Sequence, residues 1–301
     1  MIDIICEVLT PKNLAEALLL LSNADSKTKI LAGGTDVVVG KAQGSKRFAD
    51  AETLIDINRI EELKGISEKN GMISIGAAAT FSEICKSKLV EEKLPLLKKA
   101  SGTIGSLQIR NRATIAGNFV NNAPCADTVP ALLVYDASIE IKSQTATRNV
   151  SLQEFLQRPY KTQLQQGELV TRILIPVPQQ NYAGDFYKLG RRRAVAISRL
   201  TLAVLIQLKE KKIGDIRIAS GAVTPIGTRF PKLEEFAIGQ KMTDNLCQEL
   251  AKKMGEEVLA VTGLRWSSAY KLPVVQQMFY QLLKGIERLF FRAFGTEKLW
   301  K

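Results

Sequence analysis

The chain of 301 residues contains no histidine. Histidine is the commonest general base and a frequent metal ligand, so its absence excludes the Ser-His-Asp triad and most zinc sites. Four cysteines, Cys6, Cys85, Cys125 and Cys247, are dispersed and form no C-x-x-C pair. The sequence therefore has no local ligand set for zinc or for an iron–sulfur cluster. Any redox chemistry must come from a bound organic cofactor.

Long apolar runs are also missing. No stretch approaches the roughly 20 residues that a membrane-spanning helix needs. The N-terminus carries Asp3 and Glu7 and lacks the basic region of a signal peptide. We therefore expect a cytoplasmic protein without a membrane partner.

The formal net charge is +12, with the densest basic cluster at Lys188 and residues 191–193. A basic balance can indicate nucleic acid, an acidic partner or only solubility. The aromatic interleaving of RNA-binding sheets and the helix-turn-helix pattern are both absent, so we expect no nucleic-acid binding. The cluster is then either a solvated face or a surface for a dinucleotide or a partner subunit.

The most informative stretch is LAGGTDVVVG at residues 31–40. Adjacent glycines let backbone amides approach an anion closely, and consecutive amides in such a turn form a nest for a phosphate. A second small turn with a hydroxyl occurs at residues 112–118, RATIAGN. Two such turns predict a cofactor that is held from both sides.

Known nucleotide motifs do not fit the first turn. Five residues separate Gly34 from Gly40, and Ala42 stands where a P-loop needs a hydroxyl. No G-x-G-x-x-G run follows the first strand either. The alternative is a tight turn between a strand and a helix, with Asp36 as a helix cap.

The pattern of elements divides the chain near residue 178. Thr10-Pro11 predicts a helix start, with Thr10 as the N-cap. Residues 1–178 form an α/β region, with subdomains at about 1–57 and 58–178. Residues 179–301 follow with three strand candidates and then helices. The aromatic and basic tail, residues 279–301, either contacts a partner or packs on its own domain.

Several short blocks occur in an order that is typical of one family. They are PKNLAEAL at 11–18, AGGTD at 32–36, IRNRATIAGN at 109–118, APCAD at 123–127, FYKLGRR at 186–192 with AIS at 196–198, GAVTP at 221–225 and RWSSAY at 265–270. In this order the chain resembles the FAD-binding, medium subunit of the molybdenum hydroxylases, which include xanthine, carbon monoxide and nicotinate dehydrogenases.

The resemblance implies an α+β fold of the PCMH/VAO type. Two α/β subdomains at residues 1–178 bind FAD, and a carbon monoxide dehydrogenase flavoprotein-like domain at 179–301 carries a three-stranded antiparallel sheet with helices. The implied activity is that of an oxidoreductase subunit in a heterotrimer. It takes electrons from the [2Fe-2S] clusters of a small subunit and passes them to NAD or another acceptor. A large subunit with molybdopterin hydroxylates an N-heterocycle or aldehyde.

The resemblance also implies which residues contact non-covalently bound FAD, and it implies no catalytic side chain and no metal ligand. The first turn holds the pyrophosphate, the second turn the diphosphate and ribityl chain, Asp127 the adenosine ribose or flavin chain, and Ile104, Val170 and Lys188 the isoalloxazine. The full set is Leu31, Ala32, Gly33, Gly34, Thr35, Asp36, Ile104, Thr114, Ala116, Gly117, Asn118, Val120, Asp127, Val170 and Lys188. Ala116 replaces a frequent glycine of the family.

Each assignment has a plainer alternative. Asp127 could form an Asx-turn in a proline loop, and Arg110 and Arg112 could be surface charges. Two other functions also remain open. The chain could be a free-standing FAD-dependent oxidase or reductase of the same fold, or a nucleotide-binding scaffold without turnover.

Overall fold

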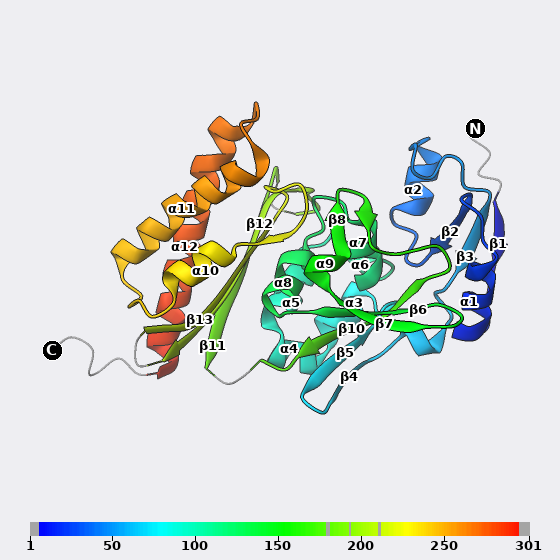
Figure 1. The fold of residues 1–301 in the computed structure, drawn as a ribbon, viewed down its shortest axis with the longest axis horizontal. Coiled ribbons are helices and arrows are strands. Elements are labelled where there is room, and N and C mark those ends of the chain that lie inside the picture. The colour runs from blue at the N-terminus through cyan, green and yellow to red at the C-terminus, as the bar shows by residue number, and fades with distance from the viewer. Residues whose placement is uncertain (1–5, 179–180, 193, 210–211, 295–301) are drawn as a thin grey trace. The chain divides into compact units, whose positions relative to one another are not determined.

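The computed structural model describes residues 6–178, 181–192, 194–209 and 212–294, which form two compact units (Figure 1). The first unit comprises Met1–Ala123 and Asp136–Val177. The second comprises Pro124–Tyr135 and Pro178–Lys301. A short segment from the middle of the N-terminal region thus packs with the C-terminal half of the chain.

The first unit begins with a small parallel sheet in the order β1-β3-β2. Its elements are β1 (Glu7–Leu9), α1 (Leu14–Ser22), β2 (Thr28–Leu31), α2 (Val37–Ala42) and β3 (Thr53–Asp56). Helix α1 buries Ala17, Leu18 and Leu21 against Ile55 and Ile57. The spacing of these three residues places them on one face of the helix.

The predicted start of α1 was wrong. Asn13, not Thr10, is the N-cap, because its side chain accepts a hydrogen bond of 2.9 Å from the Glu16 amide. The Glu16 carboxylate in turn accepts from the Lys12 amide. Strand β1 is described from Glu7, and residues 1–5 lie outside the described part.

An antiparallel sheet forms the rest of the first unit, in the order β4-β5-β10-β6-β7. Figure 1 shows α3, α5, α6 and α7 gathered on one side of it. The elements are η1 (Glu61–Leu63), β4 (Ile66–Lys69), β5 (Met72–Gly76), α3 (Phe81–Lys86), α4 (Lys88–Lys93), α5 (Pro95–Gly102), α6 (Leu107–Arg110), α7 (Ile115–Asn121), β6 (Ser138–Lys142), β7 (Thr147–Ser151), α9 (Leu152–Phe155), β8 (Leu156–Arg158), β9 (Lys161–Thr162) and β10 (Leu169–Pro176).

The second unit is built on an antiparallel sheet in the order β11-β12-β13-β14. A two-residue strand, β14, joins the three strands that the sequence predicts. The strands are β11 (Tyr182–Gly190), β12 (Ser198–Lys209), β13 (Lys212–Gly221) and β14 (Thr228–Arg229), and the helices are α8 (Thr128–Val134), α10 (Pro231–Ala237), α11 (Asp244–Thr262) and α12 (Ser268–Phe294).

Strand β12 is buried on both faces, so its apolar run is nearly continuous rather than alternating. Leu202, Val204 and Ile206 face a core that α10, α11 and α12 complete. Helix α8 lies close to the sheet at the glycines that flank the β13–β14 turn. A Cβ on Gly227 would lie 2.2 Å from Val129 Cγ1.

The described part of the C-terminal tail packs on its own unit. Phe279, Leu283, Ile286 and Phe290 of α12 are buried in the core of the second unit. At these buried positions the tail packs on its own domain, which is one of the two alternatives given by the sequence analysis. Residues 295–301 lie outside the described ranges. Within those ranges, no helix has both the length and the apolar character that membrane crossing requires.

Candidate functional site

The glycine turn links strand β2 to helix α2 in the first unit. Gly34 has φ = +73°, in the left-handed region that favours glycine. Its carbonyl accepts from the Val38 amide at 3.1 Å, which closes the turn onto the first residues of α2. The paired glycines therefore produce a strand–turn–helix connection.

The amides of this turn are available to a ligand. No hydrogen bond among the described residues has the amide of Gly33, Gly34, Thr35 or Asp36 as its donor. Backbone amides are obligatory donors, and a run of unpaired ones in a turn is a potential anion site. The residues between β2 and α2 thus fit a phosphate or pyrophosphate.

The second predicted turn lies directly against the first. A Cβ on Gly33 would lie 2.2 Å from the carbonyl oxygen of Arg112 and 2.7 Å from Ala113 Cα. Any side chain larger than hydrogen at Gly33 would force the two backbones apart. The structure thus brings together the two segments that the sequence assigns to one cofactor.

The amides of the second turn are already used within the protein. Thr114 is the N-cap of α7, and its hydroxyl accepts from the Gly117 amide at 3.2 Å. The Ile115 amide donates to Ala79 O at 2.9 Å and the Ala116 amide to Ala77 O at 3.2 Å. The Asn118 amide donates to Thr114 O. This turn can shape a wall of the site, but these amides are not available as donors.

A polar network links the two turns on one side. Asp36 occupies the N-cap position of α2 but makes no side-chain cap, contrary to the alternative above. Its Oδ1 instead accepts from Asn121 Nδ2 at 3.0 Å, and Asn121 Oδ1 accepts from Arg47. The Arg47 guanidinium lies 4.0 Å from the ring centre of Tyr160, a cation–π contact.

The pKa of Asp36 is raised, chiefly because nearby protein atoms remove water from the carboxylate, although its residue surface is still exposed. The Arg47 charge and the Asn121 hydrogen bond oppose the rise in pKa. Sequence reasoning missed Arg47, Asn121 and Tyr160, because none of them belongs to a motif and only folding brings them together.

Three other predicted residues of the first unit lie on separate elements. Ile104 is half-buried in the loop after α5, and the Arg110 Nη1 group donates to its carbonyl at 2.9 Å and to that of Gly105 at 3.2 Å. Val120 is half-buried in α7, and Val170 is buried in β10 beside a bulge. Arg110 therefore holds the Ile104 loop rather than acting as a free surface charge.

Asp127 and Lys188, both in the second unit, form a buried ion pair. Lys188 Nζ lies 2.6 Å from Asp127 Oδ2, and the Ser198 hydroxyl donates to Asp127 Oδ1. Burial raises the pKa of Asp127, while Lys188 and Ser198 act in the opposite direction. Asp127 makes no cap to α8, which argues against the Asx-turn alternative. Ser198 ends the AIS block at 196–198, and the sequence analysis assigns it no role.

The rest of the basic cluster, residues 191–193, is described only in part. Arg191 and Arg192 are exposed, and Arg193 lies outside the described residues. Across the described ranges, no group of three or more acidic or cysteine side chains could hold a metal ion.

Two family models cover most of the chain. The FAD binding domain in molybdopterin dehydrogenase matches residues 4–178, and the CO dehydrogenase flavoprotein C-terminal domain matches residues 185–286. The chain belongs to the FAD-binding medium subunits of the molybdenum hydroxylases. The family and the fold that the sequence predicts are therefore confirmed, as is the assignment to oxidoreductase subunits.

Similar medium subunits cover nearly the whole chain. The glyceraldehyde dehydrogenase medium chain of Sulfolobus acidocaldarius is 32% identical over 275 residues, which are 91% of this chain and 96% of that protein. The xanthine dehydrogenase FAD-binding subunit of Escherichia coli O157:H7 is 30% identical over 88% of this chain and 90% of that protein. A structure of carbon monoxide dehydrogenase from Hydrogenophaga pseudoflava superposes with a TM-score of 0.88 at 28% identity. The match covers 96% of this chain and 99% of that chain.

The buried pair of this medium subunit gives a pH-dependent prediction. Lys188→Met leaves the Asp127 carboxylate buried without its cation, which should destabilise the protein by about 3–5 kcal/mol at neutral pH. Burial raises the pKa of Asp127 in the folded protein above its ordinary value. Ionisation of this buried carboxyl as pH rises therefore lowers the free energy of unfolding. The variant's deficit should therefore shrink in acid, where Asp127 is protonated.

Urea unfolding at neutral and at mildly acidic pH measures this deficit. The matched control is the double variant Lys188→Met, Asp127→Asn, which should recover much of the loss at neutral pH. A deficit that is the same at both pH values would contradict the assignment of the charge to Asp127.

The glycine turn gives a second prediction. Gly34→Val should weaken FAD retention by roughly tenfold or more, because a β-branched residue is strained at φ = +73° and the turn must shift. Gly44→Val is the matched control, since Gly44 has φ = +66° but no atom within 4 Å of its added Cβ. Equal FAD affinity in the two variants would contradict the role of the turn.

Proposed function

We propose that this medium subunit holds FAD non-covalently and transfers electrons between redox centres of a multi-subunit molybdenum hydroxylase. The donor is a partner small subunit with [2Fe-2S] clusters, and a large subunit carries the molybdopterin. The acceptor is NAD⁺ or another carrier. The observation that carries the proposal is the run of unpaired amides from Gly33 to Asp36 in a chain of this family.

The residues present fit the diphosphate of FAD. Gly33 to Asp36 would donate their amides to it. The Gly33 backbone lies against the Arg112 backbone, which begins the second turn. Thr114, Ala116, Gly117 and Asn118 would form the opposite wall through side chains and carbon atoms. Ile104, Val120 and Val170 of the first unit would supply apolar contacts.

The chemistry that FAD supplies when bound is the exchange between one-electron and two-electron transfer. The chain's own residues bind the cofactor, fix its orientation and limit access by water. The absence of histidine from the chain fits this role, because hydride transfer needs no protein acid or base. The relatives named above are subunits of dehydrogenases, and this supports an electron-transfer role for the chain.

An assay of the isolated full chain tests the proposal. Loaded with FAD, the chain should reduce an artificial dye with NADH but should hydroxylate neither xanthine, nicotinate nor an aldehyde. Hydroxylation requires a molybdenum centre and a relay of thiolate-bound clusters, and the chain's dispersed cysteines do not provide that relay.

Each other result points elsewhere. Substrate oxidation by the chain alone would contradict the subunit role and favour a free-standing flavoenzyme. FAD binding without NADH activity would contradict NAD as the acceptor and favour another carrier. FAD binding with no electron transfer to any dye would favour the scaffold alternative.

A further inference from the structure

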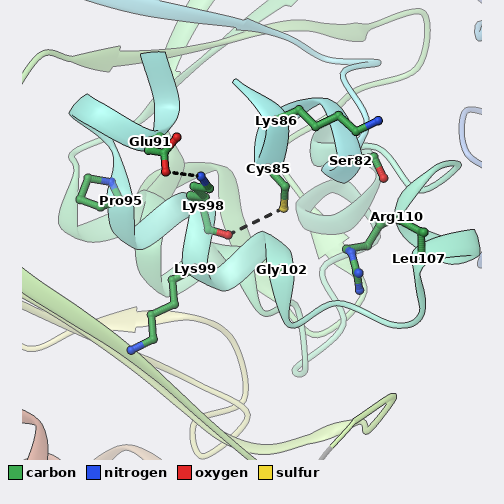
Figure 2. Close-up of a pocket in the computed structure, with 10 residues that line it drawn as sticks. All are labelled: Ser82, Cys85, Lys86, Glu91, Pro95, Lys98, Lys99, Gly102, Leu107 and Arg110. Carbon is green, nitrogen blue, oxygen red and sulfur yellow. Dashed lines mark hydrogen bonds and ion pairs between the residues drawn. The ribbon is translucent and has the colours of Figure 1, made fainter. Parts of the chain in front are cut away.

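A pocket of about 590 Å³ opens among α3, α4, α5 and α6 of the first unit (Figure 2). None of the residues predicted to contact FAD lines it. Its lining combines cations with carbon surface and a thiol. The residues that matter for its chemistry are Cys85, Lys86, Pro95, Lys98, Leu107 and Arg110.

The charge in this pocket is predominantly positive. Its one acidic residue, Glu91, forms an ion pair of 2.7 Å with Lys98 and so neutralises it. Figure 2 shows Lys98 on one side of Cys85 and Arg110 on the other, whereas Lys99 extends away. Lys86 has no ion pair with a carboxylate of the described residues, so Lys86 and Arg110 leave the pocket cationic.

The Arg110 guanidinium donates hydrogen bonds to the described protein through only one of its three nitrogen atoms. Its Nη1 group donates to the carbonyls of Ile104 and Gly105, at 2.9 and 3.2 Å. In the described part of the chain, no hydrogen bond has its Nε or Nη2 group as the donor. A guanidinium presents its donors as a planar fork that matches a carboxylate. One edge of Arg110 therefore secures the loop, and the other remains free for an anion.

Apolar carbon also lines the pocket, and Figure 2 shows Leu107 near Arg110 and Pro95 at the opposite end of the view. Leu107 is 57% exposed although it lines the pocket, and Pro95 contributes ring carbons. Burial raises the pKa of the Cys85 thiol, so it remains neutral near pH 7. A hydrated inorganic ion would leave this carbon surface uncovered. A carboxylate with an apolar body would cover it.

We infer that this pocket binds a small organic carboxylate, with the carboxyl group on the free edge of Arg110 and the apolar body against Leu107. A carboxylate bound here would also act on the flavin, an effect that rests on the proposed function. Arg110 also holds the Ile104 loop, which is predicted to lie against the isoalloxazine. A bound carboxylate would thus change the surroundings of the flavin.

Titration calorimetry with benzoate tests the inference on the full chain. Benzoate should bind, and benzamide, which has the same shape without the charge, should bind at least about tenfold more weakly. Acetate, which lacks the ring, should also bind more weakly than benzoate. Equal affinity for benzoate and benzamide, or no benzoate binding, would overturn the site.

Three variants locate the binding. Arg110→Met should reduce benzoate affinity by roughly tenfold or more, because it removes the charged fork. Leu107→Asp should do the same by repulsion, and this exposed position should tolerate the change. Lys88→Met is the control, since Lys88 is an exposed cation of α4 that does not line the pocket. Unchanged affinity in Leu107→Asp would overturn the inference even if Arg110→Met fails to fold.

Calorimetry with and without FAD separates this site from the proposed function. Benzoate should bind in both states, and it should perturb the visible flavin spectrum of the loaded chain only when Arg110 is present. Benzoate binding without any spectral change would contradict the coupling through the loop. Failure to bind FAD would contradict the proposed function while leaving the calorimetric test of the pocket intact.

Discussion

The contact between the Gly33 backbone and the Arg112–Ala113 backbone is the constraint on which the proposed cofactor site depends. It joins a turn at the end of a parallel sheet to a turn beside an antiparallel sheet, and a Cβ at Gly33 would abolish it. The two sides then divide the work. The first turn keeps its amides free, whereas the second turn uses its amides to anchor itself to Ala77 and Ala79. In the proposed site, one turn would supply hydrogen-bond donors and the other a rigid wall.

Three charged residues that the sequence analysis assigns to FAD, Asp36, Asp127 and Lys188, each contact a polar partner in their own unit. Asp36 is bonded to Asn121 near Arg47, and Asp127 is enclosed with Lys188 and Ser198. A buried ion pair adds little net stability, but loss of either partner is costly. Such contacts fix the positions of these charges within each unit. Arg110 differs from them, since its Nε and Nη2 donors are directed to no group in the described chain.

The features that could be predicted from the sequence are those set by residues that are neighbours in the chain. Two adjacent glycines before a hydroxyl and a carboxylate specify the turn at Gly34, and the ordered motifs specify the family. Helix α1 begins later than predicted because Asn13 competes successfully with Thr10 as the cap. The Asp127–Lys188 pair and the Arg47–Asn121 contact join residues far apart in the chain, so no local pattern could predict them. Whether the amides of the second turn are free depends on carbonyls of another segment, which is also a tertiary property.

Identification of the flavin released from the purified full chain tests whether the protein binds FAD non-covalently. The protein is denatured in acid, the precipitate is removed, and the supernatant is analysed by chromatography. A non-covalent FAD site predicts intact FAD in the supernatant, in close to equimolar amount with the chain, and no flavin in the precipitate. FMN, no flavin after reconstitution, or flavin that stays with the precipitated protein would contradict a non-covalent FAD site built on the glycine turn.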